Sequence, residues 1–122
     1  MDSAERRARA ERMYREVTTT DPFPPQDSYT ETTLDAVFGE LWTRPGITRK
    51  ERRWITLTCV GFSAAPTPIA YHIRAALVSG DISRGEMEEF ILHFAHYAGW
   101  PLSSTMYTEF TRLCAELDAQ DD

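Results

Sequence analysis

One histidine is the clearest candidate for chemistry in this chain of 122 residues. His72 lies one helical step from both Ile69 and Ala76, on a segment whose apolar residues recur at helical spacing. An imidazole changes its charge near neutral pH, so a histidine on an apolar face can move a proton at a reacting atom. The alternative is a structural histidine whose nitrogens are satisfied in the core.

A second polar set follows on the segment that begins near Ser83. Glu89, His93 and Tyr97 are spaced so that they share one face of a helix. We predict that they complete the polar wall of a substrate site. Two alternatives stay open, because Glu89 and His93 can form a surface pair and Tyr97 can be a packing residue.

Helices alone are predicted to position these side chains. No segment alternates like a strand, whereas three capping boxes open helices at Ser28, Thr48 and Ser83. Thr67 and Pro68 are the predicted N-cap and first residue of the helix that carries His72. The first predicted helix runs from about Ser3 to Val17, and the later ones begin at the caps Ser28, Thr48, Thr67 and Ser83 and at Pro101. Their predicted stops are Pro45-Gly46, the segment from Gly61 to Pro66, Gly80 and Gly99. We therefore expect an all-α fold, with one domain over residues 1–122 and about six helices.

Burial is predicted from the helical period. The first helix is highly charged, and the acidic tail at residues 118–122 is expected to fray. Trp54 to Phe62 is apolar around the helix, so this helix is expected to be the most buried. One continuous apolar face is expected in the second helix, made of Leu34, Val37, Phe38, Leu41 and Trp42.

Composition excludes several classes of partner. The formal charge of −6 and the dispersed basic residues argue against nucleic acid. No apolar run approaches the roughly 20 residues of a membrane span, and the charged start is unlike a secretory signal. Cys59 and Cys114 lack a CxxC or zinc spacing, so we expect two buried free thiols in a reducing, cytoplasmic compartment. We expect no metal site. A chain this small is expected to complete its core as a homo-oligomer.

The order of several short motifs resembles the carboxymuconolactone decarboxylase family, over roughly Leu34 to Phe110. Members typically show a Trp-x-Arg-Pro-Gly turn, helix arginines, a His-x-Arg-x-Ala helix, acidic residues and Tyr-x-Gly-x-Pro. The matching residues here are Trp42 to Gly46, Arg49, Arg52, His72, Arg74, Ala75, Gly80, Glu86, Glu89, Tyr97, Gly99 and Pro101.

The resemblance implies an all-helical, alkylhydroperoxidase-like fold that assembles as a dimer, trimer or hexamer. It also implies removal of a carboxylate from a lactone without a cofactor. The related peroxidases carry two cysteines at positions occupied here by Ala65 and Pro68, so thiol peroxidase chemistry is excluded at that site. Decarboxylases of the family usually carry a pair of acidic residues at the positions of Thr67 and Pro68. This chain lacks both acids, which weakens the inference that the substrate is the lactone.

A cofactor-free decarboxylation needs a cation to orient carboxylates, a donor for a developing oxyanion and an acid to protonate carbon. His72 is the candidate acid or oxyanion donor, and Arg44 and Arg49 are the candidate anion binders. Trp42 is first a core or interface residue and second a wall of the substrate site.

These residues predict a lyase or isomerase-like enzyme that acts on a small oxygenated carboxylate or lactone. The alternative is a non-catalytic, homo-oligomeric binding or assembly protein of the same fold. Nucleic acid and membrane are not expected partners.

Overall fold

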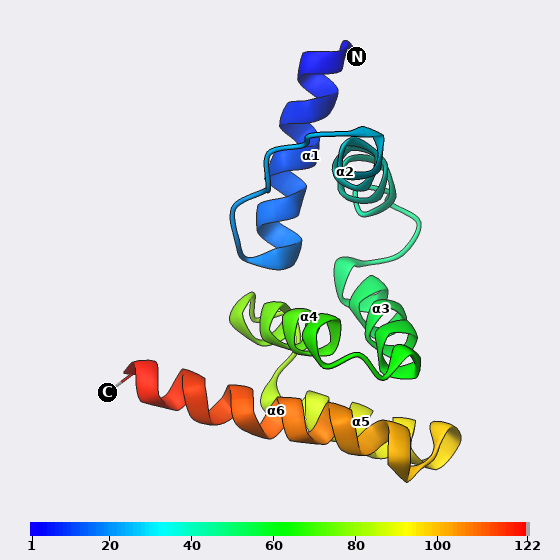
Figure 1. Ribbon diagram of the computed structural model, residues 1–122, viewed down its shortest axis with the longest axis vertical. Helices are drawn as coiled ribbons and strands as arrows, with labels where there is room; N and C mark the ends of the chain where they lie inside the picture. The colour runs from blue at the N-terminus through cyan, green and yellow to red at the C-terminus, as the bar shows by residue number, and fades with distance from the viewer. Residues whose placement is uncertain (122) are drawn as a thin grey trace. The chain divides into compact units, whose positions relative to one another are not determined.

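The computed structural model describes residues 1–121, and these residues form helices joined by short loops, without a strand. The all-α prediction is therefore confirmed. In chain order the helices are α1 (Ser3–Thr18), α2 (Ser28–Thr32), η1 (Thr33–Leu41), α3 (Arg49–Ser63), α4 (Pro66–Val78), α5 (Arg84–Ala98) and α6 (Trp100–Asp121) (Figure 1).

The chain divides into two compact units, residues 1–52 and residues 53–122, and the division falls inside α3. Each unit has its own apolar core. The single domain expected over residues 1–122 stays a prediction.

Residues 1–52 form a helical pair in which α1 packs against η1. A Cβ on Gly39 of η1 would lie 3.0 Å from the Cβ of Ala10 of α1, so the missing side chain allows the close approach. Tyr14 lies edge-on to Phe38, with 4.6 Å between ring centroids. At the surface, Arg7 binds the Asp35 carboxylate with two hydrogen bonds, of 2.7 and 2.9 Å.

The element η1 is a nine-residue π-helix that continues α2 directly. A π-helix bonds each residue to the fifth along and has more residues per turn than an α-helix. The expected apolar face therefore changes: Leu34, Phe38 and Trp42 are buried, whereas Val37 and Leu41 are exposed. The expectation for Val37 and Leu41 was wrong because it assumed the α-helical period.

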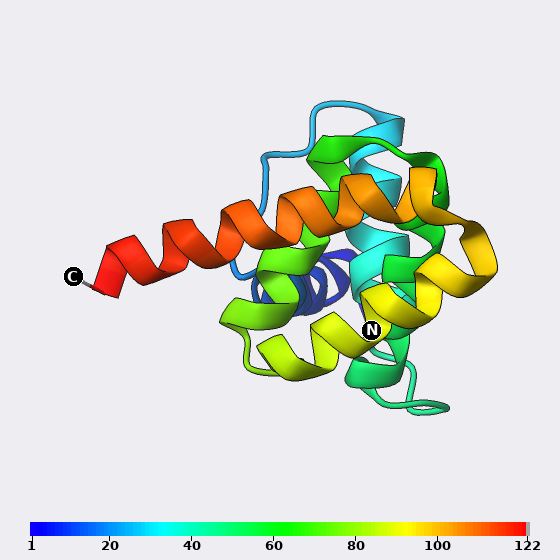
Figure 2. The same ribbon diagram turned by 90° about the horizontal axis from the view of Figure 1, so that it is seen from below.

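Residues 53–121 pack α4 and α5 against the long helix α6 (Figure 2). The core of this unit joins all four helices through the buried residues Leu57, Ile69, Ile73, Ala76, Ile82, Met87, Ile91, Phe94, Met106, Phe110 and Leu113. The apolar stripes expected on α4, α5 and α6 supply most of them.

The structure contradicts two expectations, one about the burial of α3 and one about the order of the acidic tail. Helix α3 is not the most buried, because one face alone enters a core, through Arg53, Leu57 and Gly61, while Ile55 and Phe62 are exposed. The acidic tail does not fray over residues 118–121, because α6 continues to Asp121. Residue 122 lies outside the described residues.

Local signals place the helix ends with two small errors. The capping boxes at Thr48 and Ser83 are present, and Gly80 and Gly99 take positive φ angles of 79° and 96°. The second helix is capped by Asp27, one residue before the predicted Ser28.

Helix α4 begins at Pro66, with Ala65 as its N-cap and no side-chain cap bond. Thr67 is therefore inside the helix. The helix begins at Pro66, and not at Pro68, because the fixed φ of proline suits the first helical position.

Candidate functional site

His72 lies midway along α4, at the edge of the apolar stripe that Ile69, Ile73 and Ala76 bury in the core. Its side chain is half-buried, and its ring lies edge-on to that of Tyr71, with 5.4 Å between centroids. The structure records no hydrogen bond to the imidazole within residues 1–121. Helix α4 thus presents an imidazole whose nitrogens are available to a ligand.

The charge state of His72 is set by its surroundings. Burial lowers the pKa of the imidazole below its ordinary value of 6.5, and the positive charge of Arg53 lowers it further. At neutral pH the ring is therefore uncharged. A neutral imidazole is a poor acid, but it can donate a hydrogen bond from one nitrogen and accept one at the other.

Arg53 is a buried cation that the sequence analysis did not single out. Its side chain is 2% exposed, and its Nε donates a hydrogen bond of 2.7 Å to Oδ2 of Asp81. The available signal was its spacing, because Arg53 stands four residues before Leu57 and eight before Gly61, both buried. A charged residue on that face needed a partner, and Asp81 is 28 positions away in the sequence.

The structure brings together the predicted wall residues Glu89 and His93. They line an open groove of about 460 Å³ in the second unit, with Trp54, Gly85, Glu86 and Phe90. The His93 ring stacks on Tyr97, with centroids 5.2 Å apart and planes 9° from parallel. Tyr97 is 84% exposed and is not among the residues that line the groove, and neither is His72.

This groove has the wrong charge to hold a carboxylate by itself. Its lining holds two carboxylates, Glu86 and Glu89, and neither arginine nor lysine. Glu86 also accepts a hydrogen bond from the Ser83 backbone, which commits one of its oxygens to the helix cap. The floor is aromatic, because Trp54 stacks on Phe90 with 5.3 Å between centroids. An anionic substrate would need arginines from elsewhere.

The other three predicted site residues belong to residues 1–52. Trp42 is buried in the core of that unit, as its first interpretation expected. Arg44 is exposed, and its carbonyl accepts a hydrogen bond of 3.1 Å from the guanidinium of Arg52. Arg49 forms an ion pair of 3.5 Å with Glu16. The Arg44 guanidinium thus faces solvent, while that of Arg49 is already engaged by a carboxylate.

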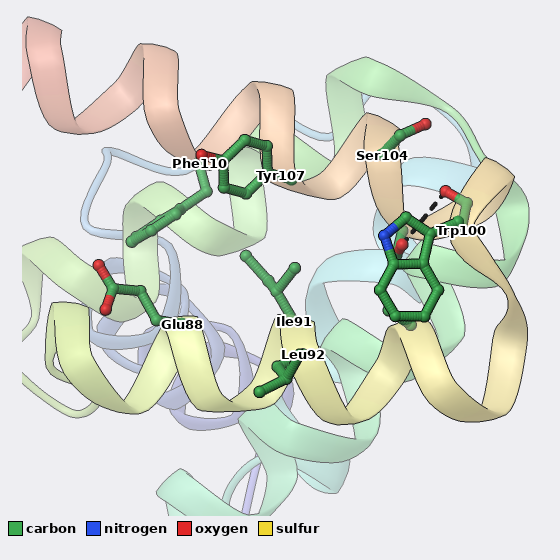
Figure 3. A pocket seen from close by; sticks show the side chains of 9 residues that line it. Glu88, Ile91, Leu92, Trp100, Ser104, Tyr107 and Phe110 are labelled. Atoms are coloured by element: carbon green, nitrogen blue, oxygen red, sulfur yellow. Dashed lines mark hydrogen bonds between the residues drawn. The ribbon is translucent and has the colours of Figure 1, made fainter.

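An apolar groove between α5 and α6 was missed by the sequence analysis. It has a volume of about 270 Å³ and is lined by Ile91 and Leu92 of α5 and by Trp100, Tyr107 and Phe110 of α6. Figure 3 shows Ile91 pointing toward the side of α6 that carries Tyr107 and Phe110. Trp100 and Tyr107 are each 60% exposed. Their spacing of seven residues puts them on one face of α6, which is the signal that could have revealed the groove.

The cysteines are not both buried, contrary to expectation. Cys59 is exposed and Cys114 is partly buried. Cys59 lies on α3 away from the face that carries Leu57 and Gly61. Within residues 1–121, no group of three or more histidine, cysteine or acidic side chains could hold a metal ion.

Among the helices that the structure describes, none has the length and apolar character needed to cross a membrane.

No protein-family model matches this chain. Among curated proteins, it is 34% identical over 67 residues to a 4-carboxymuconolactone decarboxylase of Acinetobacter baylyi. The aligned stretch covers 55% of this chain and 49% of that protein. It is 36% identical over 64 residues to the nitrosuccinic acid decarboxylase npaB of Metarhizium robertsii, covering 52% of this chain and 44% of that protein. The chain thus spans about half the length of the curated relatives it matches.

Both relatives are named as decarboxylases, and one carries the name of the family that the motifs indicated. The predicted resemblance is confirmed: this all-helical chain is similar to the carboxymuconolactone decarboxylase family.

Proposed function

We propose that this chain is a decarboxylase-like enzyme that needs no cofactor and acts on a small oxygenated carboxylate or a lactone. The observation that carries the proposal is His72, half-buried on α4 in the position of the motif that the resemblance marks. Similarity to two proteins named as decarboxylases supports the reaction class.

The substrate supplies the electron sink in this proposal. When the carbon–carboxylate bond breaks, its electron pair moves onto an adjacent carbonyl or nitro group, and carbon dioxide leaves. The protein must then hold the substrate, stabilise the new oxyanion and exclude competing reactions. His72 is the donor to that oxyanion, and Arg44 and Arg49 are the proposed binders of substrate carboxylates. Trp42, Glu89, His93 and Tyr97 remain candidates for the substrate surroundings.

Release of carbon dioxide from γ-carboxymuconolactone and from nitrosuccinate tests the proposal directly. We expect turnover of at least one such substrate, and a loss of about a hundredfold or more in His72→Ala. His96→Ala is the matched control, because His96 is exposed on α5 and bonds to the carbonyl of Leu92. Equal activity in wild type and His72→Ala would contradict the role of His72.

A second candidate function is a non-catalytic, homo-oligomeric binding protein. The apolar groove between α5 and α6 favours it, because Leu92, Trp100 and Tyr107 leave a large apolar area exposed. Light scattering at micromolar concentration measures the molar mass, and so distinguishes a dimer, trimer or hexamer from a monomer. A stable oligomer without turnover of any carboxylate substrate would favour this second candidate.

A further inference from the structure

The groove between α5 and α6 lies apart from the residues considered for decarboxylation. Its walls hold three aromatic side chains, Trp100, Tyr107 and Phe110, and none of the candidates for that reaction. Its volume of about 270 Å³ is near the lower end of the range for pockets that hold small molecules. Binding of a ligand in this groove therefore does not depend on decarboxylation.

Glu88 places a negative charge in the lining of this groove. Among the described residues that line it, Glu88 is the one that carries a charge, and its carboxylate has no hydrogen bond or ion pair within residues 1–121. Arg84, one turn earlier on α5, is engaged elsewhere, because it donates a hydrogen bond of 2.8 Å to Oδ1 of Asp118. The Glu88 carboxylate is thus available to a cation that enters the groove.

The other polar side chains of the groove are serines of α6 whose hydroxyls are engaged by the helix itself. The Ser103 hydroxyl donates to the carbonyl of Trp100 at 3.2 Å, and the Ser104 hydroxyl donates to the carbonyl of Pro101 at 2.9 Å. Figure 3 shows Glu88 pointing from α5 toward α6 and Phe110 pointing from α6 toward α5. A ligand therefore meets an apolar, aromatic surface together with a carboxylate.

A second groove extends this surface beyond Glu88. It has a volume of about 450 Å³ and shares Glu88, Tyr107 and Phe110 with the first groove. Arg84 also lines it, but the bond to Asp118 offsets the charge of that guanidinium. The Glu88 carboxylate thus lies where the two grooves meet.

The chemistry of the lining selects among ligands. A ligand ammonium would compensate the Glu88 carboxylate, and positive charge is also attracted to the faces of aromatic rings. An anion would be repelled by Glu88 and by the net charge of −6. A neutral apolar molecule would cover the rings but would leave the carboxylate without a partner.

We propose that the groove between α5 and α6 binds a small arylalkyl amine in its ammonium form. The ammonium binds the Glu88 carboxylate, and the aryl ring packs against the exposed faces of Trp100 and Tyr107. A second copy of this chain fits the groove less well. In a two-fold interface both copies would bring the same lining, with a carboxylate on each side and neither arginine nor lysine among the described lining residues.

Isothermal titration calorimetry on the full chain tests the amine with three probes of similar shape. The probes are phenethylamine, the neutral phenethyl alcohol and the anion hydrocinnamate. We expect phenethylamine to bind, the alcohol to bind about fivefold more weakly, and hydrocinnamate not to bind. Absence of amine binding, or equal affinities for the amine and the alcohol, would overturn the proposal.

Two neighbouring carboxylates give a matched pair of variants. Glu88→Gln should weaken phenethylamine about fivefold and leave the affinity for the alcohol unchanged, because the change removes the charge and keeps the shape. Glu89→Gln removes the same charge from the next residue, which lines the separate groove at Trp54, and should leave the affinity for the amine unchanged. A loss in Glu89→Gln without a loss in Glu88→Gln would place the amine at Trp54 and overturn the assignment.

Two substitutions of Tyr107 test the contact with the aryl ring. Tyr107→Ala should weaken both the amine and the alcohol about threefold to tenfold, and Tyr107→Phe should retain both affinities because it keeps the ring. Equal affinities in Tyr107→Ala and wild type would overturn this placement of the ligand.

Light scattering of Leu92→Lys tests whether a second copy occupies the groove instead. Leu92 lines the groove and is 50% exposed, so a lysine there is compatible with the fold and repels an ammonium. We expect Leu92→Lys to keep the molar mass of wild type and to lose binding of phenethylamine. A lower molar mass in the variant would assign the groove to contacts between copies and would overturn the proposal.

Discussion

Gly61 of α3 lies directly against the ring of Phe94 of α5. A Cβ placed on Gly61 would stand 2.8 Å from Cζ of Phe94 and 2.7 Å from Cε of Met106. Phe94 and Met106 are both buried in the core of the second unit, so neither can move freely. We predict that Gly61→Ala destabilises the protein by about 1–3 kcal/mol, despite the better helix propensity of alanine.

Gly85→Ala is the matched control in chemical denaturation. Gly85 is an exposed helical glycine, and the nearest atom to an added Cβ is the Ser83 hydroxyl oxygen at 3.9 Å. This substitution should be neutral, or stabilise by up to about 1 kcal/mol. Similar free energies of unfolding for the two variants would mean that the contact of Gly61 with Phe94 is not tight.

Helix capping gives a second prediction. The Ser83 hydroxyl accepts a hydrogen bond of 3.1 Å from the Glu86 N–H, whereas Thr67 makes no cap bond at the start of α4. Ser83→Ala should therefore cost about 1 kcal/mol of stability, and Thr67→Ala should change it by less than about 0.5 kcal/mol. Thermal unfolding of both variants checks this, and a larger loss in Thr67→Ala would restore Thr67 as the cap.

The two thiols should react at different rates. Cys59 is exposed, whereas burial raises the pKa of the Cys114 thiol and so reduces its thiolate fraction at pH 8. A disulfide reagent should modify Cys59 rapidly and Cys114 slowly in the folded protein. Cys59→Ser should remove the fast phase and Cys114→Ala the slow one. Peroxide turnover that disappears in the double variant would revive a thiol-based activity.

Acid should weaken the pairing of α1 with η1. The hydrogen bond from Arg7 holds the pKa of the Asp35 carboxyl below its ordinary value of 3.8. The stabilisation from this group is complete above the unfolded pKa and is lost as the pH falls through the lower, folded pKa. The difference in stability between wild type and Asp35→Asn should therefore be constant near pH 6 and shrink below about pH 3.8. A difference that does not change with pH would show that the charge of Asp35 is irrelevant.

The missing acids beside His72 give a prediction about substrate choice. We expect weak turnover of γ-carboxymuconolactone or none, because Thr67 and Pro68 occupy positions where related decarboxylases carry an acid pair. Pro68 is the third residue of α4, and a glutamate there suits the positive end of the helix. Pro68→Glu should therefore raise any trace activity toward the lactone without loss of the helix. Efficient turnover by the unmodified chain would show that the acids are dispensable.

The fold could be predicted because its signals are local. Capping boxes, the turn glycines and the helix-start prolines act within a few residues, and each helix was placed to within a few positions. The errors have local physical causes too. Asp27, one residue before Ser28, is the residue whose side chain accepts the cap hydrogen bond of α2. Helix α4 begins at Pro66, before Thr67. The π-helical period of η1 leaves Val37 exposed.

The candidate site was harder to predict because its electrostatics depend on distant residues. The spacing that singled out His72 is local, and so is the spacing that brings His93 beside Glu89. The pairing of Arg53 with Asp81 joins residues 28 positions apart, and no local pattern carries it. Charged residues are mostly exposed in folded proteins, so an arginine is expected at the surface. The burial of Arg53 was not predicted for this reason.

Two separate cores allow the chain to open in parts. The cluster around Tyr14 and Phe38 and the cluster around Ile73 and Phe94 share no residue, so unfolding of one does not by itself remove the contacts of the other. Amide hydrogen exchange should therefore fall into two groups of protection, each with its own opening free energy, with the change between them inside α3. The half of the molecule that carries His72 can in this way remain folded while the first 52 residues exchange.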